Sequence, residues 1–165
     1  MIRIKRGIYV FAEKRTEIIP EEVSALIYEP SYISMEYALR YYGFIPEAVF
    51  AITCISSKAN RDFKNIYGYY IYRNLKADLF FGYRVNKTKF GRYLFADPEK
   101  ALLDFLYLHP EIHNPEDLAG FRFNFELIGK TIDLNKFRFF LGIFNNKRLN
   151  SIAEIIIKLC LPSIN

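Results

Sequence analysis

Apolar residues in the central part of the chain are spaced as in β-strands. Four segments that are continuously apolar, or rich in Tyr, Phe and β-branched residues, lie at 48–55, 67–73, 79–85 and 90–95. This composition and length are typical of strands. Residues 86–89 are polar and have the length of a hairpin connection, whereas the polar residues 56–62 indicate a loop. The pattern predicts an α+β fold with a mostly antiparallel sheet of about four or five strands over residues 48–96.

Helix signals flank this region. Pro20, followed by two acids, predicts a short helix over 20–28, because proline suits the first helical turn and acids suit the positive helix end. Ser34 is a candidate N-cap for a second helix over 35–42, which Gly43 would end.

The clearest helix start is Asp97, which we expect to cap a helix whose first residue is Pro98. One face of this helix is apolar, and Lys100, Asp104 and Tyr107 form the opposite stripe. A Lys–Asp pair four residues apart on such a stripe adds only about 0.2–0.5 kcal/mol. The helix is therefore expected to form because its apolar face packs on the sheet.

The C-terminal part is predicted to be largely helical. We expect a short helical turn over 114–120, a strand over 121–127 where Phe alternates with polar residues, and a helix over 134–144 capped by Asp133. The last helix, about 147–160, is apolar nearly all round, which is typical of a helix buried on both faces. A second subunit or another partner could cover its outer side, so a homodimer through this helix is one prediction.

The N-terminal residues 2–11 are extended. Apolar and basic side chains alternate over 2–5, Gly7 interrupts the run, and a second extended run follows. This pattern predicts a bent strand or a short β-hairpin, with an edge strand of the main sheet as the alternative placement.

Positive charge is concentrated in the middle of the chain. The net charge of the 165 residues is +5, but residues 58–92 alone carry nine bases and two acids. Residues 13–47 carry seven acids and three bases. A basic segment on an otherwise nearly neutral chain favours contact with phosphates or with an acidic protein, and solvated strand edges are the structural alternative.

Three phrases in this order resemble the AbiEi family of bacterial and archaeal antitoxins. They are IRIKRGIYV over 2–10, PSYISMEYALRYYGFIP over 30–46 and ADPEKALLDFLY over 96–107. The resemblance implies an antitoxin and transcriptional regulator that counteracts a nucleotidyltransferase-like toxin and supports repression of its own operon. It also implies that residues 1–12 correspond to the wing of a winged helix-turn-helix and that 13–165 form an AbiEi-like antitoxin domain. The chain begins where that wing begins, so the three helices that precede it in the family are expected to be missing.

This resemblance and the charge pattern suggest where nucleic acid would bind. Without a recognition helix, phosphate contacts are expected, either with DNA flanking an operator or with RNA. The candidate residues are ten bases from residues 1–12 and 58–92, namely Arg3, Lys5, Arg6, Arg61, Lys64, Arg73, Lys76, Arg84, Lys87 and Lys89.

Other chemistries have weaker support in the sequence. Asp97, Glu99 and Lys100 loosely resemble the acid-and-lysine sets of metal-dependent nucleases, but neighbouring residues on a helix point about 100° apart. We therefore expect a protein that is not an enzyme and needs no metal or other cofactor. The second hypothesis is a protein-interaction or dimerisation module without nucleic-acid binding, and the third is a metal-dependent, nuclease-like enzyme. No apolar stretch approaches the roughly 20 residues of a membrane span, and the two cysteines form no recognisable motif. These features predict a cytoplasmic protein that does not enter a membrane.

Overall fold

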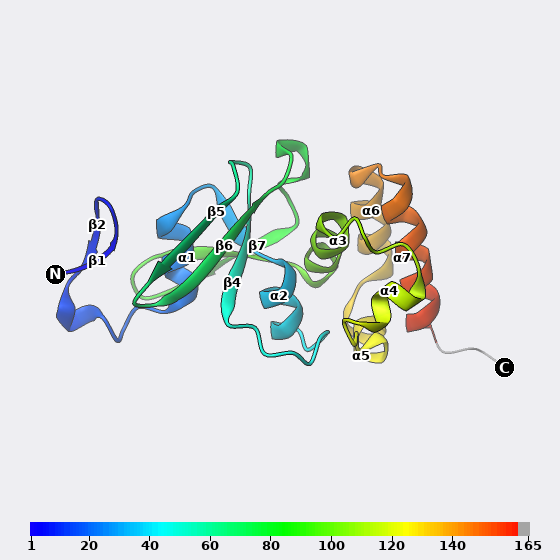
Figure 1. The fold of residues 1–165 in the computed structure, drawn as a ribbon, viewed down its shortest axis with the longest axis horizontal. Helices are drawn as coiled ribbons and strands as arrows, with labels where there is room; N and C mark the ends of the chain where they lie inside the picture. Colours follow the sequence, from blue (N-terminus) through cyan, green and yellow to red (C-terminus); the bar gives the residue numbers. More distant parts are fainter. Residues whose placement is uncertain (162–165) are drawn as a thin grey trace.

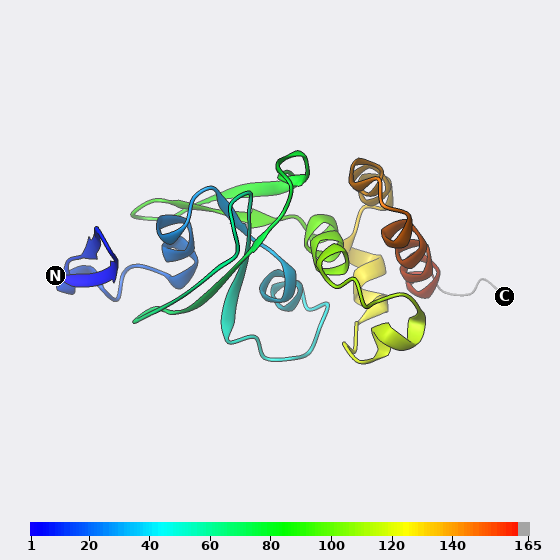
Figure 2. The same ribbon diagram turned by 45° about the horizontal axis from the view of Figure 1, so that its top comes forward.

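The computed structural model describes residues 1–161, which form an elongated α+β arrangement. A small N-terminal hairpin lies at one end, a six-stranded sheet with two helices lies in the middle, and five helices lie at the other end (Figure 1; Figure 2 gives a second view). The predicted α+β class is confirmed.

The hairpin consists of β1 (Ile2–Lys5) and β2 (Ile8–Val10), which pair antiparallel as a sheet of their own. The alternative placement, as an edge strand of the main sheet, is therefore wrong. Gly7 has a φ of 83°, a left-handed conformation that suits glycine in the connection between the two strands. A short 3-10 turn, η1 (Ala12–Lys14), follows the hairpin.

The main sheet has the strand order β5-β6-β4-β3-β8-β7. Its strands are β3 (Ser31–Ile33), β4 (Ala51–Ser56), β5 (Arg61–Asn65), β6 (Gly68–Asn74), β7 (Tyr83–Lys87) and β8 (Arg92–Ala96). Three neighbouring pairs are antiparallel, but β4 runs parallel to β6 and β3 runs parallel to β8. The sheet is therefore mixed, where the sequence predicted a mostly antiparallel one.

Two of these strands are absent from the sequence prediction. β3 is only three residues long, and the first two residues of β5 fall in the segment 56–62 interpreted as a loop. β5 is an edge strand in which Phe63 is the one apolar residue, so its pattern differs little from that of a polar loop. The predicted strand over 79–85 also shifts, because Leu79 ends the 3-10 turn η2 (Ala77–Leu79) and Gly82, at a φ of 74°, precedes β7.

Two helices pack on the sheet. Helix α1 (Pro20–Ile27) contacts β3, β4 and β8, and helix α2 (Met35–Tyr41) contacts β4 and α3 (Pro98–Leu108). Two tyrosines of β6 tie α1 to the sheet, because the Tyr72 hydroxyl donates to the carbonyl of Ser24 and the Tyr70 hydroxyl donates to that of Pro20.

The C-terminal part contains α4 (Pro115–Ala119), α5 (Phe125–Thr131), α6 (Leu134–Phe144) and α7 (Lys147–Cys160). The prediction of helices at 134–144 and 147–160 is confirmed, and Asp133 caps α6 by accepting from the N–H groups of Asn135 and Lys136. The predicted strand over 121–127 is wrong, because α5 begins at Phe125. The alternating phenylalanines instead join an aromatic cluster in which Phe105 packs edge-on against Phe121 and Phe123.

Arg148 of α7 binds the C-terminal end of α3. Its guanidinium donates to the carbonyls of Leu106, Tyr107, His109 and Ile112 at distances of 2.9–3.2 Å. A cation at this helix end satisfies carbonyls that have no partner inside the helix. This contact fixes α7 against α3, which in turn contacts α2 and β8.

Candidate functional site

The ten basic residues selected from the sequence do not form one patch. Arg61 and Lys64 lie on β5 and Arg73 on β6, whereas Arg84 and Lys87 lie on β7 at the opposite edge of the sheet. Because side chains alternate between faces along a strand, the two bases of each edge strand also point to different faces. The structure therefore places the basic residues of the segment 58–92 at different edges and faces of the sheet.

The β7–β8 hairpin is basic, but acidic residues of the N-terminal part lie beside it. Lys89 forms an ion pair with Glu17, which also pairs with Lys14 at 3.0 Å. The two lysines lie over the ring of Phe90 at the hairpin tip. The excess of acid over residues 13–47 thus neutralises part of the basic segment within the same chain.

The three bases of the N-terminal hairpin differ in their surroundings. Lys5 donates to the carbonyl of Ile27 at 2.7 Å and lies 5.4 Å above the ring of Phe63, so it holds the hairpin on the sheet. Arg3 and Arg6 are exposed, and within residues 1–161 neither forms an ion pair. They remain available for phosphate contacts.

The two longer phrases of the resemblance meet in a buried polar cluster. It consists of Tyr32 and Ser34 from one phrase and Lys100 and Asp104 from the other, and the exposed fraction of each side chain is at most 1%. The Asp104 carboxylate accepts hydrogen bonds from Tyr32 at 2.9 Å and from Ser34 at 2.8 Å, and it forms an ion pair with Lys100. The Lys100 ammonium also donates to the Tyr32 hydroxyl at 2.8 Å.

This cluster corrects two sequence predictions. Lys100 and Asp104 lie on the inside of the fold and not on an outer stripe. The Ser34 hydroxyl donates to Asp104 instead of capping α2. The Asp97 carboxylate forms an ion pair with Lys136 at 3.0 Å, and within residues 1–161 no side chain caps α3.

The electrostatics of the cluster are those of a desolvated ion pair. Burial raises the pKa of Asp104 and lowers that of Lys100, while their mutual attraction opposes both shifts. Burial and the Asp104 charge raise the pKa of Tyr32 well above its usual range, so its hydroxyl stays protonated. The Lys100 ammonium lies 4.9 Å from the ring centres of Phe81 and Phe144, so aromatic faces replace part of its hydration. The cluster joins β3, α3 and α6 without contact to solvent.

The acids of the nuclease-like phrase point elsewhere. Glu99 accepts from the backbone N–H of Asp133 at 2.7 Å, and its second oxygen lies 3.1 Å from the Lys136 ammonium. Lys100, in contrast, points into the core. No group of three or more His, Cys, Asp or Glu side chains that could hold a metal ion occurs among the residues that the structure describes.

A groove of about 920 Å³ lies between the sheet and the cluster of aromatic residues after α3. We call it the central groove. Its apolar lining includes Ile45, Val49, Ile71, Phe105, Leu108 and Phe121, and its polar lining includes Glu36, Asn60, Arg73, Asn74 and His109. Phe50 also lines it and is 93% exposed, which is unusual for so large an apolar side chain.

His109 forms part of the aromatic wall of the central groove. Its ring stacks on Phe105 with centroids 4.1 Å apart, and its Nδ1 lies 2.7 Å from the carbonyl of Phe105. A carbonyl only accepts, so Nδ1 carries the proton. The Nε2 atom lies 3.7 Å from the carboxylate of Glu36.

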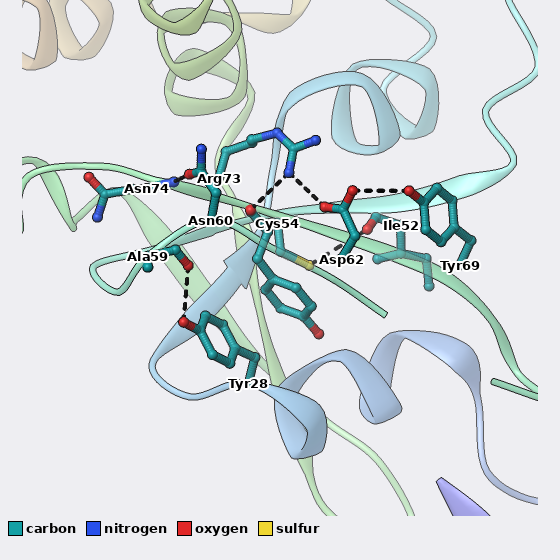
Figure 3. Close-up of polar contacts among 10 residues, drawn as sticks. Tyr28, Ile52, Cys54, Ala59, Asn60, Asp62, Tyr69, Arg73 and Asn74 are labelled. Atoms are coloured by element: carbon teal, nitrogen blue, oxygen red, sulfur yellow. Dashed lines mark hydrogen bonds and ion pairs between the residues drawn. The ribbon is translucent and has the colours of Figure 1, made fainter. Parts of the chain in front are cut away.

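At the other end of the groove, Arg73 and Asp62 form an exposed counterpart of the buried cluster (Figure 3). Arg73 Nη1 lies 2.7 Å from the Asp62 carboxylate, which also accepts from the Tyr69 hydroxyl at 3.0 Å. The hydrogen bond from Arg73 lowers the pKa of Asp62. Asn60 and Asn74 lie beside this pair, with the Asn60 amide oxygen accepting from the backbone N–H of Asn74 at 2.7 Å.

The last helix is covered more completely than its sequence predicts. Helices α3, α5 and α6 pack on α7, and Ile152, Ile156 and Ile157 are buried within the chain. Leu159 and Leu161 remain about half exposed. The apolar surface left for a partner is therefore small.

None of the helices within residues 1–161 combines the length and the apolar character needed to cross a bilayer. A scan against protein-family models and a search of curated proteins returned no match to this chain. The AbiEi resemblance therefore rests on its three phrases.

Proposed function

We propose that the chain is a non-enzymatic, cytoplasmic antitoxin and regulator module of the AbiEi type, which opposes a nucleotidyltransferase-like toxin. The observation that carries the proposal is the convergence of the two longer phrases on the buried Lys100–Asp104 cluster. Residues that resemble the family most closely thereby build its scaffold, and binding is left to exposed surfaces. A buried, fully hydrogen-bonded ion pair suits this structural role.

Nucleic acid, in this proposal, contacts the N-terminal hairpin through Arg3 and Arg6. Both side chains are exposed, whereas Lys5 is already bound to Ile27 and serves to position the hairpin. Reversing the charge of both arginines should weaken binding to operator-flanking DNA and flatten its dependence on salt concentration, because fewer counterions are released. An Arg84→Glu, Lys87→Glu variant tests the β7 edge of the sheet in the same assay. An unchanged salt dependence of binding in the Arg3 and Arg6 variant would count against the assignment to the hairpin.

The direct test is co-expression with an AbiE-type nucleotidyltransferase-like toxin. Growth rescued by the chain supports the proposal, and loss of rescue in Arg3→Glu, Arg6→Glu would link it to nucleic acid. Failure of a folded chain to rescue any such toxin would overturn it.

A second candidate is a dimerisation module, supported by Leu159 and Leu161, which remain about half exposed at the end of the last helix. Sedimentation velocity separates the two. A stable dimer that Leu159→Glu dissociates would favour this alternative.

A further inference from the structure

The central groove has the size and chemistry of a ligand site and is not used by the proposed function. Its volume of about 920 Å³ lies within the range of small-molecule pockets, and its lining is mainly apolar with a few polar groups that point inward. It crosses the boundary between the sheet and the C-terminal helices, since β4, β6, α2 and α3 all contribute residues.

One wall of the groove is aromatic. His109 stacks on Phe105, and Phe121 packs edge-on against Phe105 with centroids 5.1 Å apart. Phe50 lines the same groove while almost entirely exposed, so its ring is available to a ligand without any rearrangement of the core. Proteins that bind unpaired bases use aromatic faces in this way, because every base has a π-face.

The polar groups of the groove have unused hydrogen-bonding capacity. The Asn60 amide uses its oxygen and the Asn74 amide uses its nitrogen, which leaves one amide nitrogen and one amide oxygen without a partner in the part of the chain described. Within residues 1–161 the Glu36 carboxylate accepts no hydrogen bond, and the His109 Nε2 atom lies 3.7 Å from it. The Glu36 carboxylate, which lies beside the aromatic wall, can accept from the exocyclic amino group of a base.

Positive charge lies at one end of the groove. Asn60 and Arg73 line both the groove and an adjoining hollow, which Arg61 and Asp62 complete. Arg73 uses only Nη1, for Asp62 and for the carbonyl of Tyr72, and its Nε and Nη2 groups make no hydrogen bond within residues 1–161. Arg61 is exposed and enters no ion pair there. Arg61 pairs with Tyr72 across β5 and β6, so its side chain lies on the other face of the sheet from Arg73. The Arg73 guanidinium can therefore bind a phosphate beside the groove.

From this arrangement we propose that the central groove binds a nucleotide whose base carries an exocyclic amino group. The base lies against Phe50 and the aromatic wall, its amino group donates to Glu36, and its phosphate lies at Arg73. The nucleotide is either free or an unstacked residue of single-stranded RNA, since both present the same base and phosphate.

Two probes distinguish the sources. Adenosine 5′-monophosphate, titrated calorimetrically, represents a free nucleotide, and a fluorescein-labelled short oligoadenylate, followed by anisotropy, represents single-stranded RNA. Saturable binding of either one is expected, with an oligouridylate binding more weakly because uracil lacks the amino group. Binding of the monophosphate alone would assign the site to a free nucleotide, and tighter binding of the strand would assign it to RNA.

Matched variants locate the site. Phe50→Ala should weaken binding about tenfold, because stacking on one aromatic side chain contributes that much, while Phe139→Ala on the outer face of α6 should not change it. Phe139 is 68% exposed, so neither substitution disturbs the core. Arg73→Gln should also weaken binding, whereas Arg84→Gln at the opposite sheet edge should leave it unchanged.

Three results would overturn the proposal. The first is that the folded chain binds neither probe. The second is that Phe50→Ala and Phe139→Ala weaken nucleotide binding equally. The third is that Phe50→Ala abolishes toxin binding while no nucleotide binds, which would assign the groove to a protein partner. Toxin neutralisation that survives Phe50→Ala would leave the antitoxin proposal intact, so the two proposals fail separately.

Discussion

The structure contains two clusters with the same chemistry in opposite environments. In each cluster, a basic side chain forms an ion pair with an aspartate, and this aspartate also accepts a hydrogen bond from a tyrosine hydroxyl. The residues are Lys100, Asp104 and Tyr32 in the core, and Arg73, Asp62 and Tyr69 on the sheet surface. The side chains of the first ion pair are 0% exposed, and those of the second are 37% and 43% exposed. The comparison teaches that burial, and not the set of partners, decides whether such a cluster holds the fold together or remains available to a ligand.

The largest expected effect comes from removing the buried base. Lys100→Met keeps the length of the side chain but leaves Asp104 without its counter-ion, and such a change costs about 3–5 kcal/mol of unfolding free energy. Arg73→Met is the matched surface variant and should cost less than about 1 kcal/mol, because water solvates the remaining Asp62 carboxylate. Urea unfolding followed by circular dichroism measures both.

The double variant Lys100→Met, Asp104→Leu is the control for this prediction. It removes both charges and should recover much of the stability lost in the single variant, since apolar pairs often replace buried ion pairs without loss. A double variant as unstable as Lys100→Met would show that shape, and not the unpaired charge, causes the destabilisation.

The tyrosine hydroxyls give the second comparison. Tyr32→Phe removes a donor to the buried carboxylate and should cost about 1.5–3 kcal/mol, the range for hydrogen bonds to charged groups. Tyr69→Phe removes the equivalent donor at the surface and should change the unfolding free energy by less than about 0.5 kcal/mol. Equal costs in thermal or urea unfolding would contradict the role assigned to burial.

Gly82 tests how tightly the buried cluster is packed. Its φ is +74°, and an added Cβ would lie 3.0 Å from Lys100 Cγ and from the ring of Phe140. Gly82→Ala should therefore cost about 1–3 kcal/mol through backbone strain and crowding. Gly142→Ala is a suitable control, because nothing lies within 4 Å of the added atom and its φ is helical. A cost no larger than that of the control would indicate that the cluster can adjust.

The smallest effect concerns the titration of the exposed cluster. The pKa of Asp62 lies below its ordinary value of 3.8 because Arg73 donates to the carboxylate. The pair therefore stabilises the fold above that pH, and the contribution is lost as the pH falls through the lowered pKa; it amounts to less than about 0.5 kcal/mol. In NMR titration, Arg73→Met should return the Asp62 pKa toward 3.8, and a pKa that does not move would exclude Arg73 as the cause.

Local signals in the sequence predicted most helices well. Pro20, Pro98 and Asp133 mark helix starts through the geometry of the first turn, which depends on a few neighbouring residues. Strands were predicted less well. β3 forms because it pairs with β4, which is distant in sequence, and the polar β5 forms because it pairs with β6 across a turn. The phenylalanines at 121–125 show the same limit, since a period of two can also arise from packing into an aromatic cluster.

The candidate sites were harder to predict than the fold. Lys100 and Asp104 have the spacing of an ordinary surface pair, and no local signal indicates that Tyr32 and Ser34, some seventy positions earlier, will enclose them. Phe50 and Phe121 likewise line one groove although they lie some seventy positions apart in the sequence. The contiguous run of basic residues was misleading, because the strand order places its two ends at opposite sheet edges.

By itself the sequence determined where most helices start, that a tyrosine-rich sheet occupies the middle of the chain, and the overall positive charge. These properties depend on neighbouring residues and on composition alone. The tertiary structure decided which charged residues are buried, which edges of the sheet are basic, and where a groove opens. Each of these depends on contacts between residues far apart in the chain, and burial changes the free energy of a charge by more than any local preference does.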